Sequence, residues 1–291
     1  MARIPRVRGA VALAVRHKVV GQLDGVHPSL HVGRSLDFND LREYAAGDDV
    51  ADIDWRATAR TGELLIRRHV AERRSALLVA LTTGVQLAGL AAPGVRKRDL
   101  ALDAAATLAV LAHAFGDHAG LLWCDDGSPR AARPTTRLVD LERQLTAAEA
   151  TVSPDAAPTD LDRLLGTAAR TLRRRGVVAV ISDDVLLDPQ LESRVRRLGA
   201  QHTVLWLTVP DADPTDPRLG GPLLDLERGA RLPDWLYDER LRRDLADERA
   251  RRATLRANAL MRLGVAHAEL GDPATVVADV VSLVRRLRHV R

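Results

Sequence analysis

Residues 33–60 contain the part of the sequence with the clearest chemical character. Acidic and basic side chains are interleaved there with Tyr44 and Trp55 more densely than in an ordinary loop. Charged side chains are rarely buried unless they are paired. Side chains of opposite charge, placed among two aromatic rings, can therefore form a self-satisfied network beneath a surface platform. This pattern does not by itself name an activity.

The same residues form a recognisable signature. Phe38 is followed by the runs Leu41 to Tyr44, Gly47 to Asp49, Ile53 to Arg56 and Thr58 to Arg60. Their order resembles the signature of the domain-of-unknown-function 58 family, in which a small β-rich segment precedes a von Willebrand factor A-like domain. The chain departs from that signature at Ser35, Asp37, Ala46 and Ala51. The candidate partner-binding or network residues are Arg42, Glu43, Tyr44, Gly47, Asp48, Asp49, Asp54, Trp55, Arg56, Thr58 and Arg60.

The elements that must position this signature are indicated by alternating apolar runs and helical patterns in the rest of the sequence. Apolar runs of strand length predict buried parallel strands, and they occupy residues 75–82, 119–124, 176–182 and 203–209, with a weaker run at 265–269. Helical patterns lie between them, at residues 100–115, 137–148, 160–175, 188–198, 236–263 and 273–288. This alternation predicts an α/β fold, a doubly wound and mostly parallel sheet flanked by helices.

The pattern also divides the chain into three parts. Residues 1–20 read as an amphipathic helix, residues 21–74 as the β-rich signature segment, and residues 75–291 as the von Willebrand factor A-like domain. A loop rich in Pro, Asp and Gly, with a short hairpin inside it, is expected at residues 210–233. Asp160 and Asp272-Pro273 have the chemistry of helix N-termini, and Arg173 to Arg175 are expected to cap a helix C-terminus.

A metal site is the main chemistry that the family resemblance implies for such a fold. It would lie at the carboxyl ends of the strands, where the family fold uses an Asp-x-Ser-x-Ser loop, a Thr and an Asp to hold Mg²⁺. Thr82, Gly84 and Gln86 replace the ligands of the first loop. Thr159 and Asp183 remain, although Thr159 suits a helix cap better and Asp183 could equally cap a helix or be solvated. We therefore expect a degenerate site that binds metal weakly or not at all.

Other catalytic arrangements are not indicated. The sequence has no phosphate-binding glycine loop, zinc motif or nucleophile elbow, and no basic patch with interleaved aromatics that would indicate nucleic-acid binding. The chain has 291 residues, a net charge of +4 and a single cysteine, Cys124, which follows an apolar run and is expected to be a partly buried structural thiol. No segment is apolar for long enough to span a bilayer. These features predict a soluble, cytoplasmic protein without stable membrane insertion and without a cofactor.

Together, the residues and the resemblance predict a non-enzymatic interaction scaffold. The resemblance implies that its partner is a MoxR-type AAA+ ATPase in a chaperone-like assembly or maturation system. For Asp54, Trp55 and Arg60 we expect an internal role, joining the two segments, rather than direct contact with the partner. A metal-dependent ligand-binding module is the alternative, and a nucleic-acid-binding protein that relies on its many arginines is a weaker one.

Overall fold

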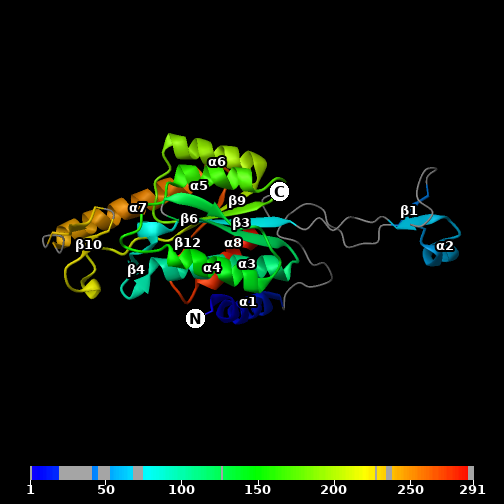
Figure 1. Cartoon of the computed structure of the whole chain (residues 1–291), viewed down its shortest axis with the longest axis horizontal. Helices are drawn as coiled ribbons and strands as arrows, with labels where there is room; N and C mark the ends of the chain where they lie inside the picture. The colour runs from blue at the N-terminus through cyan, green and yellow to red at the C-terminus, as the bar shows by residue number, and fades with distance from the viewer. Residues whose placement is uncertain are drawn as a thin grey trace.

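A six-stranded sheet forms the centre of the molecule, with the strand order β12-β9-β8-β3-β6-β7 (Figure 1). The structure is a computed structural model that describes residues 2–19, 41–44, 53–67, 75–125, 127–226, 228–233 and 238–287. The strands of the sheet are β3 (Ala76–Leu81), β6 (His118–Asp125), β7 (Ser128–Ala131), β8 (Val177–Ser182), β9 (Thr203–Thr208) and β12 (Ala266–Glu269).

Five of these strands are parallel, and β7 is antiparallel to β6. β3 is central, because Val79 is in register with Leu121 of β6 on one side and with Ala179 of β8 on the other. The apolar runs predicted as strands are β3, β6, β8, β9 and β12, so these strands are confirmed, although β12 is only half-buried. β7 was not predicted, since it is short and its residues are mostly exposed.

Helices cover both faces of the sheet, which confirms the predicted doubly wound α/β fold. Alternate residues of β3 face opposite ways: Leu77 and Val79 pack with one group of helices, and Leu78 and Ala80 with the other. The first group is α3 (Lys97–Ala114), α4 (Leu138–Ala150) and α8 (Val276–Arg286). The second is α5 (Leu161–Thr171), α6 (Pro189–Gln201) and the C-terminal end of α7 (Glu239–Arg262).

The N-terminal helix α1 (Arg3–Val19) adds to the first group. Its apolar side chains Ile4, Val7 and Val11 are buried in the same core cluster as α3, α4 and α8, and the helix packs on all three. In Figure 1 it lies along the outer side of α3. The sequence therefore predicts this helix correctly as amphipathic, and the structure identifies what its apolar side covers.

Shorter elements follow the strand ends. They are the 3-10 helices η2 (Gly84–Leu87) and η3 (Pro217–Leu219) and the paired strands β4 (Leu90–Ala92) with β5 (Val95–Arg96) and β10 (Leu224–Asp225) with β11 (Ala230–Arg231). The last pair is the hairpin predicted within residues 210–233. The segment before it is held to the body, because the amide of Ala212 donates to the carbonyl of Leu90 at 2.8 Å.

Several helix ends differ from the prediction by a few residues, and two of them have a clear local cause. α8 begins at Val276 instead of residue 273, because the carbonyl of Asp272 accepts hydrogen bonds from the amides of Thr275 and Val276 in a turn that precedes the helix. α5 ends at Thr171, where the buried Leu172 takes an extended conformation that leads into β8. The exposed Arg173 to Arg175 therefore lie in a bend after the helix, and their predicted capping role is wrong.

Candidate functional site

The described part of the signature segment forms a small module. β1 (Leu41–Glu43) pairs antiparallel with β2 (Leu65–Arg67), and α2 (Trp55–Thr61) lies between them in sequence. Two further backbone bonds extend the pairing: the amide of Tyr44 donates to Leu64 and that of Asp54 to Leu65, both at 2.8 Å. We refer to residues 41–44 and 53–67 as the signature module.

Asp54 and Thr58 fix α2 within the signature module. The Asp54 carboxylate caps the helix, accepting hydrogen bonds from the amides of Arg56 at 3.0 Å and Ala57 at 3.1 Å. The Thr58 hydroxyl accepts from the amide of Leu65 at 3.1 Å, which ties the helix to β2. Gly62 ends the helix in the left-handed conformation that its lack of a Cβ atom permits. Asp54 therefore acts inside the module as a helix cap, and its predicted role in joining the two segments stays a prediction.

Trp55, Arg56 and Arg60 differ from these residues because their side chains are exposed. Trp55 is 64% exposed, although it is the largest apolar side chain of the module. Arg60 donates from Nε only to the carbonyl of Arg56, at 3.2 Å, within its own helix. Trp55 and Arg60 therefore lie on the surface of α2, and their predicted role in joining the two segments stays a prediction.

The remaining signature residues are described to different extents. Glu43 is exposed and Tyr44 is half-buried. Arg42 is opposite Ile66 in the β1–β2 ladder. Gly47, Asp48 and Asp49 lie outside the described residues.

The residues expected at the degenerate metal site meet at the carboxyl ends of the strands. Thr82 and Thr83 follow β3, Asp183 follows β8, and Thr159 precedes α5. The hydroxyl of Thr83 donates to the carbonyl of Cys124 at 2.6 Å and accepts from its amide at 3.1 Å. The hydroxyl of Thr82 donates to the carbonyl of Ile181 at 3.3 Å. Each of these threonines therefore links β3 to a neighbouring strand.

Thr159 connects the two loops that would hold an ion. Its hydroxyl accepts from the amide of Thr83 at 3.1 Å and donates to the carbonyl of the same residue at 2.9 Å. The side chain of Gln86 bonds to the amide and the carbonyl of Thr159, at 2.9 and 3.2 Å. The predicted role of Thr159 as a helix cap is wrong, since Asp160 caps α5 by accepting from the amide of Arg163. We call this set of bonds among Thr83, Gln86 and Thr159 the loop clasp.

Gly84 lets the two loops come this close. Its φ is +76°, and a Cβ atom placed on it would lie 2.2 Å from the carbonyl oxygen of Ala157. Any other residue type would clash with that backbone and adopt an unfavourable conformation. The family pattern has a metal ligand at this position. Here the close approach of the Ala157 backbone requires a glycine instead.

These residues do not fit an octahedral Mg²⁺ site. The ion requires several oxygen ligands directed at one point, whereas Gly84 has no side-chain oxygen, and the hydroxyls of Thr83 and Thr159 each donate one hydrogen bond and accept another from backbone groups. Within the described ranges, no group of three or more His, Cys, Asp or Glu side chains could hold a metal ion. Nearby, burial raises the pKa of the Cys124 thiol, which agrees with a structural role.

The neighbouring Asp184 belongs to a different cluster. Asp184 forms an ion pair with Arg256 of α7. The guanidinium of Arg256 also lies 2.8 Å from the carboxylate of Glu269, at the end of β12. Arg256 is 1% exposed, so this cluster anchors α7 to the ends of two strands. Sequence analysis did not identify Arg256, because nothing in a helical run of arginines distinguishes the buried one.

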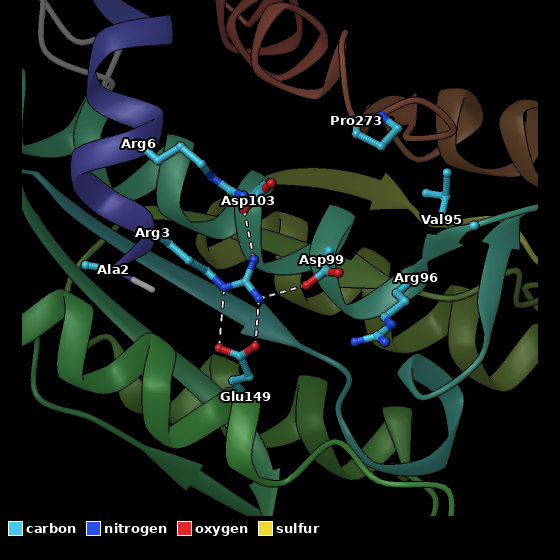
Figure 2. A pocket seen from close by; sticks show the side chains of 10 residues that line it. Ala2, Arg3, Arg6, Val95, Arg96, Asp99, Asp103, Glu149 and Pro273 are labelled. Carbon is cyan, nitrogen blue, oxygen red and sulfur yellow. Dashed lines mark hydrogen bonds and ion pairs between the residues drawn. The ribbon is translucent and has the colours of Figure 1, made fainter.

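A second missed cluster surrounds Arg3, which lines a cavity of about 330 Å³ (Figure 2). Its guanidinium contacts Asp99 and Asp103 of α3 at 2.9 and 3.0 Å, and Glu149 of α4 at 2.7 Å. Glu142 of α4 accepts from the first amides of α1, those of Arg3 and Ile4, each at 2.8 Å. Burial opposes the charge of Arg3, but the three carboxylates outweigh it and raise its pKa. The cluster therefore holds α1 in place.

Among the helices of the described chain, none is both long and apolar enough to cross a membrane.

Comparison with solved structures gives matches of low overall similarity. One is an aerotolerance-related membrane protein from Bacteroides fragilis, 13% identical, with a TM-score of 0.44 over 73% of this chain and 99% of that one. Another is a von Willebrand factor type A protein from Catenulispora acidiphila, 12% identical, with a TM-score of 0.41 over 77% of this chain and 44% of that one.

Comparison of sequences is more informative. The uncharacterized protein Rv1480 of Mycobacterium tuberculosis is 30% identical over 283 residues, which cover 95% of this chain and 87% of that protein. A protein of Mycobacterium bovis, the uncharacterized protein Mb1516, matches to the same extent. The family model described as "Protein of unknown function DUF58" matches residues 40–255. Since this match includes most of the chain, the protein belongs to the DUF58 family.

Proposed function

We propose that this protein is a non-enzymatic interaction scaffold that binds a MoxR-type AAA+ ATPase through the exposed surface of α2. Trp55, Arg56 and Arg60 form this surface, which we call the α2 platform. Asp54 and Thr58, whose hydrogen bonds hold α2 in the signature module, would fix the orientation of the helix without contacting the partner.

The exposure of Trp55 is the observation that carries this proposal. An indole ring that is 64% exposed leaves a large apolar area in water. Tryptophan and arginine are the residue types most enriched at the energetic centres of protein interfaces. Here Trp55 and Arg56 lie in the first turn of α2, and Arg60 lies one turn after Arg56.

The support beneath the platform adds to the argument. Asp54 caps α2 and Thr58 fastens it to β2, so the helix is already ordered before any partner binds. Pre-ordering lowers the entropy lost on binding. A seven-residue helix is too short to be stable alone in water, and these bonds explain how the chain keeps it folded.

The identity of the partner rests on the family resemblance. The resemblance implies association with a MoxR-type ATPase, which would supply the energy for an assembly reaction. We also propose the cytoplasm as the compartment, because the single cysteine is buried and makes no disulfide. The metal-dependent alternative is less well supported, because the loop clasp uses the groups that an ion would need.

A binding measurement with purified proteins tests the proposal. The full-length chain is immobilised and exposed to the MoxR-type ATPase encoded nearest to it. We expect retention of the ATPase by the wild type, and at least about a tenfold loss of affinity with Trp55→Ala, since central interface residues contribute about 2 kcal/mol or more. Arg56→Ala combined with Arg60→Ala should weaken binding in the same direction.

Matched control variants lie at the start of α4. Val139 is an apolar side chain that is 60% exposed, and Arg137 is an exposed arginine two residues earlier. Val139→Ala and Arg137→Ala should leave binding unchanged. All variants should keep the wild-type circular dichroism spectrum and melting temperature. Failure of the wild type to retain the ATPase, or equal losses in platform and control variants, would overturn the proposal.

A further inference from the structure

The acids of α5 and α6 are used close to the starts of these helices. Asp160 and Asp188 cap the two helices by accepting hydrogen bonds from backbone amides. Asp162 of α5 forms an ion pair with Arg194 of α6 at 2.5 Å, and Glu192 of α6 forms one with an arginine of α7 at 3.1 Å. Beyond these residues, the rest of each helix and the strand that follows it contain no Asp or Glu.

Exposed arginines gather at the other ends of the same helices. They are Arg170 in the last turn of α5, Arg173, Arg174 and Arg175 in the bend before β8, and Arg196 and Arg197 in the second half of α6. We call this set the α5–α6 basic patch. None of its members forms an ion pair with another residue of the described chain, and Arg170 donates only to the hydroxyl of Thr167, at 3.2 Å. The patch therefore carries a positive charge that the described part of the chain does not neutralise.

Several contacts bring the bend beside the end of α6. The amide of Thr203, just after α6, donates to the carbonyl of Gly176, just after the bend, at 2.9 Å. Burial lowers the pKa of His202, at the end of α6, and the nearby charge of Arg175 lowers it further. α5 and α6 also lie side by side on one face of the sheet (Figure 1). The patch is therefore a single surface at the edge of the sheet where β8 begins, opposite the loop clasp.

Packing of the chain alone does not account for these arginines. Arg170 is favourably placed, since the C-terminal end of a helix is negative. Arg173 to Arg175 follow Leu172, whose extended backbone ends α5, and their side chains make no hydrogen bond to another described residue. Adjacent like charges repel one another. A negatively charged partner would relieve this repulsion.

We propose that the α5–α6 basic patch binds the anionic headgroups of a membrane surface. A guanidinium donates two parallel hydrogen bonds to a phosphate, and it gives up its water more readily than the ammonium of lysine does. Clusters of about four to eight basic residues are typical of surfaces that bind anionic lipids, because each residue adds to the attraction. The patch has a cluster of this size without an acid that would repel the headgroups.

The surroundings of the patch favour lipid headgroups over other polyanions. None of the exposed large apolar side chains of the described chain lies on α5, in the bend or on α6, so a protein interface here would lack an apolar centre. These segments contain no Phe, Tyr or Trp on which the bases of a single strand could stack. A duplex groove admits one helix or one β-ribbon, whereas the patch extends over two neighbouring helices and the bend. A layer of headgroups requires neither stacking nor a groove.

This surface is separate from the one in the proposed function. The α2 platform belongs to the signature module, whereas the α5–α6 basic patch belongs to the body built on the sheet. The cytoplasmic leaflet is the anionic one, which agrees with the compartment proposed above. The two surfaces share no residue, so a variant of one should keep the binding of the other, and the two proposals fail independently.

The test measures how the full-length chain sediments with lipid vesicles. One set of vesicles is an equal mixture of phosphatidylcholine and phosphatidylglycerol, and the other is phosphatidylcholine alone. Binding to a labelled double-stranded DNA, at the same phosphate concentration, is followed by fluorescence anisotropy. We expect binding to the anionic vesicles at low salt, its loss at high salt, and weaker binding to the neutral vesicles and to the DNA. The variant with Arg173→Gln, Arg174→Gln and Arg175→Gln should bind the anionic vesicles at least about tenfold more weakly.

A matched variant controls for the change in net charge. The variant with Arg133→Gln, Arg240→Gln and Arg243→Gln removes exposed arginines outside the patch, and it should weaken binding by less than about threefold. The patch variant should melt at the same or a higher temperature than the wild type, because it loses only repulsion between like charges. Absence of binding to the anionic vesicles, equal binding to the neutral vesicles, equal weakening by both variants, or tighter binding of the DNA would overturn the proposal.

Discussion

The side chain of Gln86 pairs with both backbone polar groups of Thr159, its Oε1 accepting from the amide at 2.9 Å and its Nε2 donating to the carbonyl at 3.2 Å. The amide side chain thus makes the same two hydrogen bonds with Thr159 that the backbone of a neighbouring β-strand could make. The contact joins the loop after β3 to the segment before α5. These are two of the loops that would have to supply metal ligands. Hydrogen bonds between the protein's own groups therefore join these loops where an ion would otherwise be held.

Magnesium should therefore have little effect on stability. We expect millimolar Mg²⁺ to leave the melting temperature of the wild type and of Asp183→Ala unchanged, because a ligand stabilises a protein only as far as it binds the folded state. Calorimetry or dye-monitored melting measures this directly. Strong stabilisation of the wild type by Mg²⁺, with none for Asp183→Ala, would contradict the conclusion that the loop clasp replaces the ion.

Substitution of Gly84 should be more damaging than an ordinary glycine substitution. Gly84→Ala requires an unfavourable positive φ and places Cβ 2.2 Å from the Ala157 carbonyl oxygen. Gly94 has nearly the same φ, +75°, but a Cβ atom added there would meet nothing within 4 Å, so it isolates the conformational cost. We expect Gly94→Ala to lose about 1–2 kcal/mol of unfolding free energy and Gly84→Ala at least about 2 kcal/mol more. Urea unfolding of both variants gives the comparison; equal losses would show that the loops separate easily.

Removal of Arg3 should release α1 from the body. Arg3→Ala leaves Asp99, Asp103 and Glu149 close together without their shared cation (Figure 2). Asp99 is 45% and Glu149 35% exposed, so water screens part of the loss, and we expect the cost to lie below that of a fully buried ion pair, about 3–5 kcal/mol. Hydrogen exchange measured by mass spectrometry should show faster exchange throughout α1.

The exposed Arg8 in the same helix provides the control for Arg3. Arg8→Ala should leave the exchange of α1 at the wild-type rate. If Arg3→Ala also leaves the exchange unchanged, the apolar contacts of Ile4, Val7 and Val11 alone are sufficient to hold the helix.

His267 should make the protein less stable as the pH falls. Burial, helped by the charges of Arg256 and Arg286, lowers its pKa to about 4, while an unfolded histidine titrates near about 6.5. The unfolded state therefore binds more protons between these values, and the stabilisation is complete above about pH 6.5 and is lost as the pH falls towards 4. Urea unfolding at steps from pH 7.5 to 4.5 should show this loss.

Replacing His267 separates its effect from that of other groups. His267→Gln keeps a polar group near the Thr208 hydroxyl, which lies 3.2 Å from Nε2, but removes the titration, so stability should fall less steeply with pH. Some slope should remain, because burial also lowers the pKa of His202. An unchanged slope in His267→Gln would exclude His267 as a source of acid sensitivity.

The central strands of the sheet could be predicted from sequence because they are buried on both faces. Runs such as Leu77 to Leu81 are apolar without interruption, which few other structures require. β4, β5 and β7 could not be found in this way, since they are two to four residues long and lie partly in solvent. Helix ends were also hard to predict, because they depend on single hydrogen bonds. The carbonyl of Asp272 accepts from two amides in a turn that precedes α8, and this turn sets where the helix begins.

The candidate sites were less predictable than the fold. The sequence placed Thr82, Thr159 and Asp183 at one edge of the sheet, because the carboxyl ends of parallel strands meet there. It could not show that Thr159 faces Thr83 and Gln86, which depends on the path of a loop. The exposure of Trp55 and the burial of Arg3 and Arg256 also depend on tertiary contacts, since the same residue types occur throughout the chain in other environments.

The helical layer that contains α1 brings together helices that are far apart in the sequence. α1 packs against α8, although almost the whole sequence separates them. During translation, at roughly 5–20 residues per second, α1 leaves the ribosome many seconds before α8 is made. Until then the apolar side chains of α1 lack part of their cover. The order of synthesis therefore opposes the order of packing, and this layer can close only after α8 has been made.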